Sequence, residues 1–527
     1  MQDSPPARRG MMVAPHYLAS RAGRDVLQEG GNAIEAMVAA AAAIAVAYPH
    51  MNALGGDGFW LIAEPGQAPV GLQACGCAAQ LADRDFYAGH QRIPARGPLA
   101  ALTTAGTVGG WRDALTLSQQ WGGRLPLARL LAPAAEHARH GIPVSRSQAS
   151  LTASRFEALA KVPGFAEHLM MAGAAPTEGA VLRQPRLAET LEQLARAGLD
   201  DFYRGELGAA MGEDLERLGS PLRHADLQGY APQWVTPLSR AVRQGRVWNL
   251  PPPTQGVASL MILGIFDRLG SSRAESFAHL HGLIEATKQA FLDRDRYVTD
   301  PRWMTLDPEA LLSDEHLDQL ATAIDPQRAM AWPQPIDAGD TVWMGCIDGE
   351  GRAVSFIQST YWEFGSGLVL PSTGVLWQNR GIGFSLTPNA RQALLPGRLP
   401  FHTLNPALAR LDNGETLVYG TMGGEGQPQT QAAIFTRHVH FGQPLQQAIT
   451  APRWLLGRTW GEESTTLKLE SRFDAALIDD LRAAGHEVEL LAPYSDAMGH
   501  AGAVARHADG CLEGGADPRS DGEVSAF

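Results

Sequence analysis

The sequence predicts an α/β protein whose first part is rich in helices and whose second part is rich in strands. Three observations predict this class: a long apolar helix near the N-terminus, helical patterns from roughly residue 100 to 330, and short strand patterns beyond Thr341. The chain has 527 residues, enough for one large domain or a few. Its content of 45% hydrophobic and 19% charged residues is typical of a soluble globular protein.

The segment GGNAIEAMVAAAAAIAVAYPH (30–50) predicts a buried helix that ends before Pro49, because proline cannot continue the helical hydrogen bonds. Its apolar run from Ala36 to Tyr48 has 13 residues, which suits a core helix better than a membrane span. LGGDGFWLIAEPG follows. A phosphate-binding glycine loop runs from strand to helix, whereas this one runs from helix to strand. A tight glycine turn that leads into a strand is the better interpretation.

Four later segments predict helices: LPLARLLAPAAEHARHG, RLAETLEQLARAG, FAHLHGLIEATKQAFLDRDRY and DPEALLSDEHLDQLATAID. In the last, Asp307 and Pro308 form a plausible N-cap and first turn. PQRAMAWPQPIDAGD (326–340) has three prolines and no periodicity, which predicts an exposed, mobile connector.

Beyond the connector, TVWMGCI, the turn DGEG and RAVSFIQST predict a β-hairpin. Further strands are expected around GVLWQNRG and ETLVYGTMGG, and a helix followed by a strand at DAALIDDLRAAGHEVELL.

Composition excludes several function classes. The net charge of −13 argues against a nucleic-acid partner, because phosphate binding needs a basic face. A small anionic substrate is still compatible, since one local arginine can outweigh a distant acidic surface. The N-terminal region has no apolar run that suits a signal peptide, so we expect a cytoplasmic protein with no membrane partner.

Cysteine and histidine usage predicts neither disulfides nor a metal site. Cys75 and Cys77 form a CxC, and Cys346 and Cys511 stand alone, so we expect buried free thiols. None of the 16 histidines is joined by Cys or carboxylates at a zinc-like spacing, and GxSxG, GKS/GKT and HExxH are absent. We therefore assign no metal and no organic cofactor.

Thr341 opens the predicted hairpin directly behind the connector. A threonine hydroxyl is a poor nucleophile unless a base takes its proton, and the residue's own α-amino group can do so when the chain begins there. That amino group has a pKa of about 7.7–8.0, so it is a base at cellular pH. The peptide bond before Thr341 would first have to be cut. A mobile connector would let the chain move as this cut requires. From spacing alone, an ordinary strand-opening threonine remains the alternative.

Seven blocks of the sequence resemble the γ-glutamyltransferase family of N-terminal-nucleophile hydrolases and keep that family's order. The resemblance implies an αββα sandwich with the Thr341 strand at its centre, formed by both halves of a self-cleaved precursor. Residues 1–340 would be the large (α) subunit and 341–527 the small (β) subunit, separated by a cut between Asp340 and Thr341. These two subunits would be each other's partners, and a dimer of the two-chain unit is one expected assembly. The blocks are residues 30–62, 103–111, 251–260, 279–301, 340–367, 419–429 and 514–522.

The resemblance also assigns catalytic roles. Thr341 matches the family's nucleophile, and Gly423 and Gly424 match the glycine pair whose backbone N–H groups form the oxyanion hole. Ser359 falls where the family has a threonine hydroxyl near the nucleophile. A plain turn after a strand and a solvent-facing serine are the structural alternatives.

Departures from the family concern the substrate. The arginine that grips the glutamyl α-carboxylate corresponds to about Cys75, and a neutral thiol cannot form such a pair. The acidic residue that holds the substrate α-amino group aligns with Gly383. The family's serine pair becomes His402 and Thr403, and an asparagine becomes Tyr361. This sequence therefore lacks both of the charged side chains with which the family binds the α-carboxylate and the α-amino group of an amino acid.

At one position this sequence carries a positive charge that the family usually lacks. Arg380, which follows Asn379 in WQNRG, stands where the family usually has a neutral glutamine. A cationic fork near the nucleophile suits a carboxylate close to the scissile carbonyl. We therefore expect a small anionic amide as substrate, with an ordinary surface arginine as the alternative. The residues expected to bind it are Arg380, Asn379, Tyr361, His402 and Thr403.

The segments around Thr341 and Arg380 are most similar to the oxamate amidohydrolase branch of the family. That similarity implies hydrolysis of oxamate to oxalate and ammonia, late in purine (oxalurate) breakdown. Two alternatives keep the nucleophile but take a larger acyl group: a γ-glutamyltransferase or glutathione hydrolase, and a cephalosporin-type acylase. A non-catalytic binding protein on the same fold is the third alternative.

Overall fold

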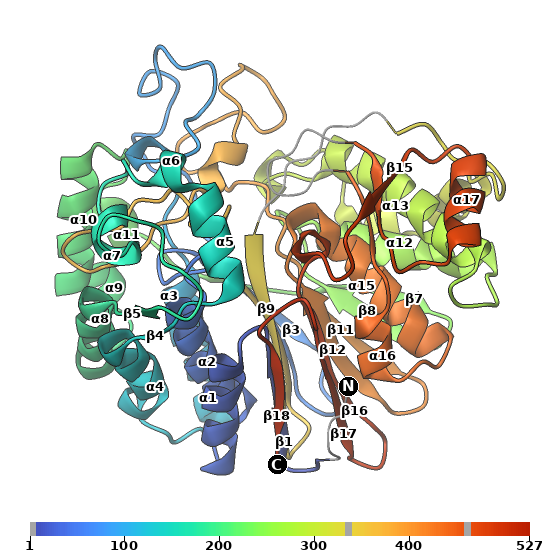
Figure 1. The fold of residues 1–527 in the computed structure, drawn as a ribbon, viewed down its shortest axis with the longest axis horizontal. Coiled ribbons are helices and arrows are strands. Elements are labelled where there is room, and N and C mark those ends of the chain that lie inside the picture. The colour runs from blue at the N-terminus through green and yellow to red at the C-terminus, as the bar shows by residue number, and fades with distance from the viewer. Residues whose placement is uncertain (1–6, 333–339, 458–464) are drawn as a thin grey trace.

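Two antiparallel sheets lie face to face, and helices cover the outer side of each (Figure 1). The structure, a computed structural model, describes residues 7–332, 340–457 and 465–527. Because each sheet has one face toward the other sheet and one toward helices, most of its inner strands are buried on both sides, whereas its edge strands are partly exposed. The predicted αββα sandwich is confirmed.

The first sheet has seven strands in the described chain, in the order β18-β1-β9-β10-β2-β3-β6. The strand that contains Thr341 is β9, an inner strand between β1 and β10. The strands are β1 (Gly10–Ala14), β2 (Asp57–Ala63), β3 (Val70–Ala74), β6 (Gln233–Val235), β9 (Asp340–Asp348), β10 (Ala353–Tyr361) and β18 (Glu523–Ala526).

The second sheet has six strands over the same described ranges, in the order β17-β16-β12-β11-β8-β7. Both sheets take strands from both sides of Asp340, so the part of the chain before Asp340 also supplies strands to each sheet. Apart from β2, which follows the predicted glycine turn, the short strands before residue 250 escaped detection because stronger helical patterns surround them. The strands are β7 (Leu238–Val242), β8 (Gly245–Asn249), β11 (Ala407–Leu411), β12 (Thr416–Thr421), β16 (Ala501–Arg506) and β17 (Leu512–Ala516).

The two helical layers differ in origin (Figure 1). The layer on the first sheet comes from the first 228 residues, whereas the layer on the second sheet combines segments from both parts of the chain. The first layer contains α1 (Tyr17–Gln28), α2 (Ala33–Ala47), α3 (Thr107–Gln120), α4 (Leu127–His140), α5 (Arg146–Ser154), α6 (Phe156–Leu159), α7 (Phe165–Leu169), α8 (Pro185–Ala197), α9 (Asp201–Arg204), α10 (Glu206–Leu218) and α11 (His224–Gln228). The second contains α12 (Gly256–Leu269), α13 (Phe277–Tyr297), α14 (Asp314–Thr322), α15 (Gln427–Phe435), α16 (Leu445–Thr450) and α17 (Ala475–Ala483).

Two small sheets lie outside the sandwich. One joins β4 (Ile142–Pro143) to β5 (Val181–Leu182), and the other joins β13 (Trp454–Leu456), β14 (Leu467–Glu470) and β15 (Val488–Leu491).

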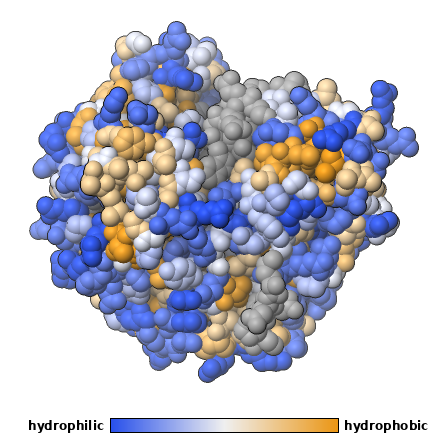
Figure 2. Space-filling model, viewed as in Figure 1, coloured by the Kyte–Doolittle hydropathy of each residue, from blue (hydrophilic) through white to orange (hydrophobic). Residues whose placement is uncertain are grey.

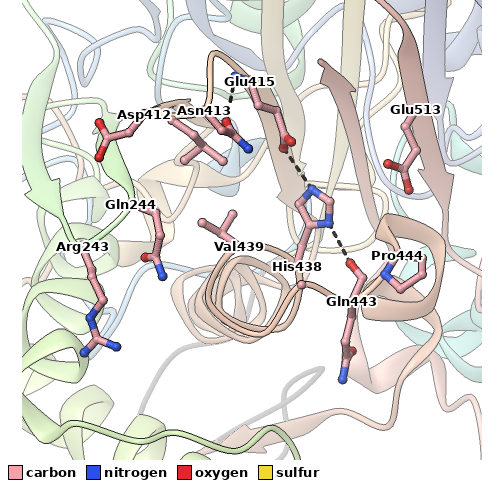
Figure 3. A pocket seen from close by; sticks show the side chains of 12 residues that line it. Arg243, Gln244, Asp412, Asn413, Glu415, His438, Val439, Gln443, Pro444 and Glu513 are labelled. Carbon is pink, nitrogen blue, oxygen red and sulfur yellow. Dashed lines mark hydrogen bonds and ion pairs between the residues drawn. The ribbon is translucent and has the colours of Figure 1, made fainter. Parts of the chain in front are cut away.

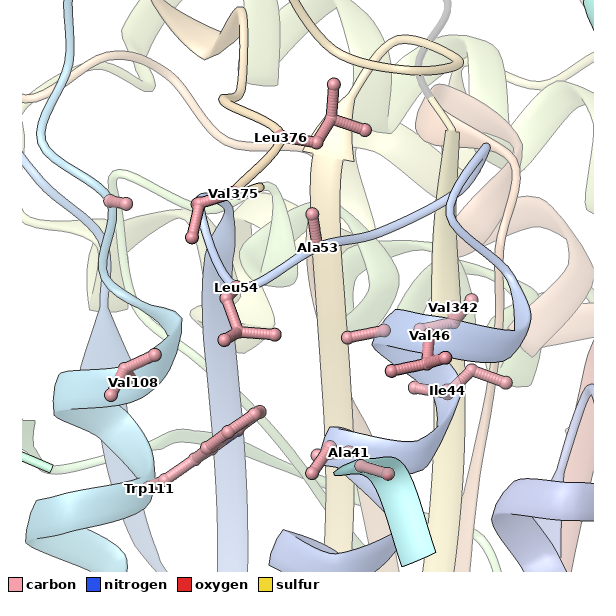
Figure 4. Packing of buried hydrophobic residues seen from close by; sticks show 14 of the residues in the cluster. Ala41, Ile44, Val46, Ala53, Leu54, Val108, Trp111, Val342, Val375 and Leu376 are labelled. Carbon is pink, nitrogen blue, oxygen red and sulfur yellow. The ribbon is translucent and has the colours of Figure 1, made fainter. Parts of the chain in front are cut away.

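The helix α2 packs on β9 and β10, as its apolar sequence requires (Figure 4). All of its residues are buried, and Asn32 and Glu35 form a capping box at its start. Ala41, Ile44 and Val46 of α2 lie near Val342 of β9 in the same apolar cluster. The predicted helix, its stop before Pro49 and its buried position are confirmed.

Between the sheets, Trp343 of β9 fills the space above two glycines of the second sheet. A Cβ at Gly420 would lie 2.2 Å from Trp343 Cδ1, and one at Gly502 would lie 2.6 Å from its ring. Glycine at these positions therefore makes room for the indole. Because α2 packs on the other face, β9 is held from both sides.

Several local predictions are confirmed, and others need correction. The hairpin β9–β10, the strand β12 and the unit α17–β15 form as expected. GVLWQNRG does not form a strand of either sheet; Val369 bridges Leu376, Gly55 bridges Trp377, and Arg380–Gly383 form a 3-10 turn. Those residues fold into a loop that contacts several elements rather than one neighbouring strand.

Asp307 caps a short 3-10 turn at Pro308–Leu312 rather than the expected single helix. A second cap at Ser313 starts α14, because its hydroxyl accepts the N–H of His316. In the predicted connector, 333–339 lie outside the described residues, and the part before them is attached to its surroundings. The N–H of Ala329 donates to Ala484 O at 2.8 Å, so this part is less free than its prolines suggest.

The surface agrees with the composition. Hydrophilic side chains cover most of the face in Figure 2, in keeping with the net charge of −13. All four cysteines are free; Cys75 and Cys346 are buried, whereas Cys77 and Cys511 are half-buried. No helix within the described ranges combines the length and the apolar character that crossing a membrane would need.

Candidate active site

The Thr341 hydroxyl lies between two polar side chains near the start of β9. It donates to Ser359 Oγ on β10 at 3.4 Å, and Gln427 Nε2 at the start of α15 donates to it at 3.5 Å. Thr341 and Ser359 are 1% and 2% exposed. In the unbroken chain the nitrogen of Thr341 is a peptide amide and has no basic lone pair. An amine base exists there only after the bond to Asp340 is cut.

A strained residue follows Ser359. The β9–β10 register shifts between Gln358 and Tyr361, and Tyr361 has a φ of +82°. That conformation is unfavourable for a bulky side chain and persists only where the surroundings enforce it. The Tyr361 N–H donates to Ser359 Oγ at 2.8 Å, so the strained backbone fixes the hydroxyl beside Thr341.

Gly423 and Gly424 follow β12 and precede Gln427. Their φ angles of +116° and +53° are ones that glycine adopts without strain. The Gly423 carbonyl accepts the N–H of Gly426 at 2.8 Å, and the Gly424 carbonyl accepts Gln255 Nε2 at 2.9 Å. No acceptor in the described ranges takes the N–H of either glycine. Two fixed, unused donors therefore stand in the turn that leads to Gln427.

The predicted substrate-binding residues gather around Arg380. Its guanidinium carbon lies 3.6 Å from the centre of the Tyr361 ring, and Nη1 donates to Thr403 Oγ1 at 3.3 Å. Arg380 is 3% exposed, so it is no surface arginine. His402 is buried against Phe59, and burial, helped by Arg380, brings its pKa well below the ordinary value. Arg380, Tyr361, His402 and Thr403 thus form one buried cluster.

The side-chain amide of Asn379 is hydrogen-bonded to the backbone around it. Its Oδ1 accepts the N–H of Trp362 at 3.1 Å, and its Nδ2 donates to Ala95 O at 3.0 Å. Both ends of the amide are therefore engaged, which favours positioning of the loop over direct contact with a substrate.

Cys75 and Gly383 adjoin the same cluster. Burial raises the pKa of the Cys75 thiol well above its ordinary value, with a further contribution from Asp57, so the thiol stays neutral. A Cβ at Gly383 would lie 4.0 Å from Arg380 Nη2. The two positions that the resemblance assigns to the charges of an amino acid are therefore neutral in this chain, and Gly383 lies close to Arg380.

Asp57, which no sequence pattern singled out, lies opposite Ser359 in the β2–β10 ladder. The predicted glycine turn that leads into a strand is present, since the N–H of Gly56 donates to Ala53 O at 3.2 Å and β2 follows. Gly56 also permits a close approach, because a Cβ there would lie 2.2 Å from Ser359 O. The overlooked signal is an acidic residue that opens an otherwise apolar strand.

Three buried side chains offer ligand atoms within 4.8 Å of one another: His281, Glu285 and His486. His281 Nδ1 already lies 2.9 Å from His486 Nε2, and Lys288 Nζ lies 2.7 Å from Glu285 Oε1. A cation would meet a neighbouring ammonium and break the histidine pair. Glu285 Oε2 accepts the N–H of Met330, so the group attaches the connector to α13. The sequence signal for this group was the i, i+4 spacing of His281 and Glu285.

A cavity of about 660 Å³ lies at the far end of β12 from the glycine pair (Figure 3). Its histidine, His438, is hydrogen-bonded within the protein through both ring nitrogens. His438 Nε2 is 3.0 Å from Glu415 Oε1, and His438 Nδ1 is 2.9 Å from Gln443 O. The cavity is remote from Thr341, so the site is defined by the chemistry around Thr341 rather than by the size of a hollow.

A buried ion-pair network supports the glycine turn. Asp517 lies between Arg453 and Arg519, and Arg453 Nη1 donates to Gly499 O at 2.8 Å. Gly499 in turn packs on the backbone before Gly423, since a Cβ there would lie 2.4 Å from Met422 O. Burial alone would raise the pKa of Asp517, but Arg453 and Arg519 bring it below the ordinary value.

Asp517→Ala is expected to lower the free energy of unfolding by about 3–5 kcal/mol, because Arg453 would stay buried without its carboxylate partner, whereas Arg519 would keep Glu470. Urea denaturation of the variant measures this loss. The exposed Asp479, which pairs with Arg482, provides a control whose alanine variant should lose less than about 1 kcal/mol. Because the pKa of Asp517 is lowered, its contribution is present above the unfolded-state pKa and is lost as the pH falls through the folded-state pKa. Equal losses in both variants would contradict the network's role.

Comparison with known proteins gives a consistent result. The family model for gamma-glutamyltranspeptidase matches residues 19–527. The chain is 55% identical to the oxamate amidohydrolase proenzyme of Klebsiella pneumoniae, with all of both chains covered. It is 42% identical to the glutathione hydrolase-like YwrD proenzyme of Bacillus subtilis, over 97% of each chain. Among solved structures, a cephalosporin acylase from Bacillus halodurans superposes with a TM-score of 0.92 at 33% identity, covering 100% of this chain and 97% of the other.

Proposed function

The chain belongs to the gamma-glutamyltranspeptidase family and is an amidohydrolase, and from this premise we propose that its substrate is oxamate. The observation that carries the proposal is the full-length 55% identity to an oxamate amidohydrolase proenzyme. The buried Arg380 supports it, because a guanidinium can bind a carboxylate through two parallel hydrogen bonds. In the cell, the reaction would be a late step of purine breakdown through oxalurate.

The active form is proposed to arise by self-cleavage between Asp340 and Thr341. Thr341 Oγ1 attacks the Asp340 carbonyl carbon, the C–N bond breaks, and the nitrogen of Thr341 takes a proton to become a free amine. Water then hydrolyses the Asp340 ester, which leaves residues 1–340 and 341–527 as two chains. The word proenzyme in the names of both relatives supports this step. A dimer of the two-chain unit stays a prediction.

Turnover would use the new amine. The Thr341 α-amino group takes the hydroxyl proton while Oγ1 attacks the amide carbon of oxamate. The N–H groups of Gly423 and Gly424 stabilise the oxyanion. The α-ammonium returns the proton to the leaving nitrogen, so ammonia departs and an oxalyl ester remains on Thr341. The same amine then takes a proton from the water that attacks the ester, and it returns this proton to Oγ1 as the ester C–O bond breaks and oxalate leaves.

The other residues would orient the reactants. Ser359 and Gln427 hold Thr341 Oγ1 through the contacts described above. Arg380 takes the substrate carboxylate, with Thr403 beside it, and Asn379 holds the loop that presents Arg380.

Ammonia release from oxamate, measured beside hydrolysis of γ-glutamyl-p-nitroanilide, tests the proposal. We expect ammonia from oxamate and no nitroaniline. Turnover of the glutamyl compound alone would make the protein a glutathione hydrolase or an acylase, as the names of two relatives suggest. The neutral Cys75 and Gly383 positions count against that outcome. An uncut chain with no turnover would indicate a binding protein.

A further inference from the structure

The side-chain amide of Gln255 joins the glycine turn to the loop that carries Thr403. Its Nε2 donates to Gly424 O at 2.9 Å and to Thr403 O at 2.7 Å. The hydroxyl of Thr403 in turn accepts Arg380 Nη1 at 3.3 Å. Gln255 is fully buried, so these hydrogen bonds lie in a dry environment, where they are stronger than in water. One side chain therefore connects the turn of the proposed oxyanion hole with the proposed carboxylate site.

The backbone of Gln255 is held against the same loop. Its N–H donates to His402 O at 2.9 Å, and the N–H of His402 donates to Pro253 O at 2.8 Å. Gln255 is also the N-cap residue of α12, a helix whose first turns are buried. The side chain therefore starts from a fixed point.

Arg294 of α13 determines which end of the amide faces the turn. Its Nη1 donates to Gln255 Oε1 at 2.9 Å, and its Nη2 forms an ion pair with Glu425. A guanidinium can only donate hydrogen bonds, and the two backbone carbonyls can only accept them. The amide oxygen must therefore face Arg294, and the amide nitrogen must face the carbonyls. Arg294 is 1% exposed, and its guanidinium carbon lies 3.8 Å from the centre of the Phe291 ring, so its own position is confined as well.

The glycine turn needs restraints of this kind. Glycine adopts positive and negative φ with similar ease, so Gly423 and Gly424 do not by themselves determine which way the adjoining peptide planes face. The Gly423 carbonyl, which shares a plane with the Gly424 N–H, accepts the N–H of Gly426 at 2.8 Å. The plane on the other side of Gly424 is held by Gln255 Nε2. Without Gln255 this plane would be released, and the turn could adopt conformations in which its N–H groups no longer meet the oxyanion.

We propose that Gln255 is a positioning residue for the reaction: its side-chain amide, oriented by Arg294, holds the oxyanion turn in one conformation relative to the loop of Thr403. The proposal rests on the proposed function, since it assumes that the N–H groups of Gly423 and Gly424 stabilise the oxyanion. That interaction exists only once the substrate carbon has been attacked. The loss of Gln255 should therefore affect kcat more than KM.

Gln255→Met and Gln255→Glu remove the two donors in different ways. Methionine keeps a similar length without a polar group, whereas glutamate keeps the shape and the contact with Arg294 but turns an oxygen toward the two carbonyls. Both should lower kcat for oxamate by roughly 10- to 100-fold and raise KM by less than about threefold, since complete loss of one oxyanion donor costs about 100- to 1,000-fold. The fall should be similar for oxamide, the neutral diamide of the same acid, because the oxyanion forms with either substrate.

The rates are counted per cut molecule, measured on a denaturing gel, so that incomplete processing does not enter kcat. If one of the two variants does not fold, the other decides the question.

Gln184→Met is the matched control. Gln184 is also buried, and its Nε2 donates to a backbone carbonyl, Val46 O, at 3.0 Å. It precedes α8 in the helical layer of the first sheet, so its loss should lower stability and change kcat by less than about twofold. A purely structural role of Gln255 predicts the same behaviour, so lower stability with an unchanged kcat in the Gln255 variants would overturn the proposal.

Hydrogen exchange, measured by mass spectrometry on peptides within residues 419–429, gives a reading that needs no turnover. The N–H of Gly426, which Gly423 O accepts, should exchange roughly tenfold faster in both Gln255 variants and at the wild-type rate in Gln184→Met. If exchange rises in this way but the wild type does not hydrolyse oxamate, the proposed function fails while the positioning of the turn is supported. If oxamate is hydrolysed and the Gln255 variants keep the wild-type exchange, the positioning role alone fails.

Discussion

Thr341→Ala will leave one polypeptide of 527 residues that hydrolyses no amide. Alanine has no Oγ, so neither the bond to Asp340 nor the substrate can be attacked, and no α-amino base is created. A denaturing gel should show pieces of 340 and 187 residues (527 − 340) for the wild type and one band for the variant. N-terminal sequencing of the smaller piece should begin at Thr341.

Two variants separate chemistry from folding. Thr341→Ser keeps a hydroxyl and should still cut and turn over, at a lower rate. Ser359→Ala removes a neighbour that lies 3.4 Å from the nucleophile, so it should slow both steps by roughly tenfold without abolishing either. A wild-type chain that stays uncut and is fully active would contradict the proposed processing.

Arg380→Ala should raise KM for oxamate by roughly 100-fold and change kcat much less. Removing one partner of a buried charge pair costs about 2–5 kcal/mol, and the other partner here is the substrate carboxylate. The guanidinium is already oriented by the Tyr361 ring at 3.6 Å and by Thr403 at 3.3 Å, so it holds its position before binding. Steady-state kinetics of the processed enzyme measure the effect.

Related variants distinguish charge from shape. Arg380→Lys keeps the charge but not the planar fork, so its KM should lie between those of the wild type and the alanine variant. Tyr361→Leu removes the ring face and should raise KM by roughly tenfold. For neutral oxamide, Arg380→Ala should change KM by less than about threefold. An unchanged KM for oxamate in Arg380→Ala would exclude this residue from the site.

Local sequence patterns predicted local structure well. The helix α2 and the hairpin β9–β10 form as predicted, because apolar periodicity and turn residues act within one segment. The pairing of β1 with β9 and β18 joins residues hundreds of positions apart, and no local pattern encodes such a pairing. The loop around Arg380 was mistaken for a strand because its apolar residues are buried by several elements instead of one sheet.

The site was predictable where a residue has a counterpart in relatives. Thr341, Ser359 and the glycine pair follow from the resemblance, and the geometry brings Thr341 and Ser359 together. The close packing of His402 and Thr403 with Arg380 depends on a bridge between Thr254 and His402, which sequence spacing does not reveal. Asp57 was missed because a glycine turn explains its surroundings without assigning the carboxylate any role.

Strands from before and after the proposed cut lie side by side in each sheet, which implies that the fold forms in the uncut chain and cannot form again from two separate chains. In the first sheet, β1 from before the proposed cut lies between β18 and β9 from after it, and β2 lies beside β10. Two separated chains could not slide into these places, since each would have to pair with strands that are not yet in position. The protein therefore acquires its shape as one chain and retains it as two. A mature molecule that loses that shape has no simple route back, and its lifetime depends on how slowly the sheets come apart.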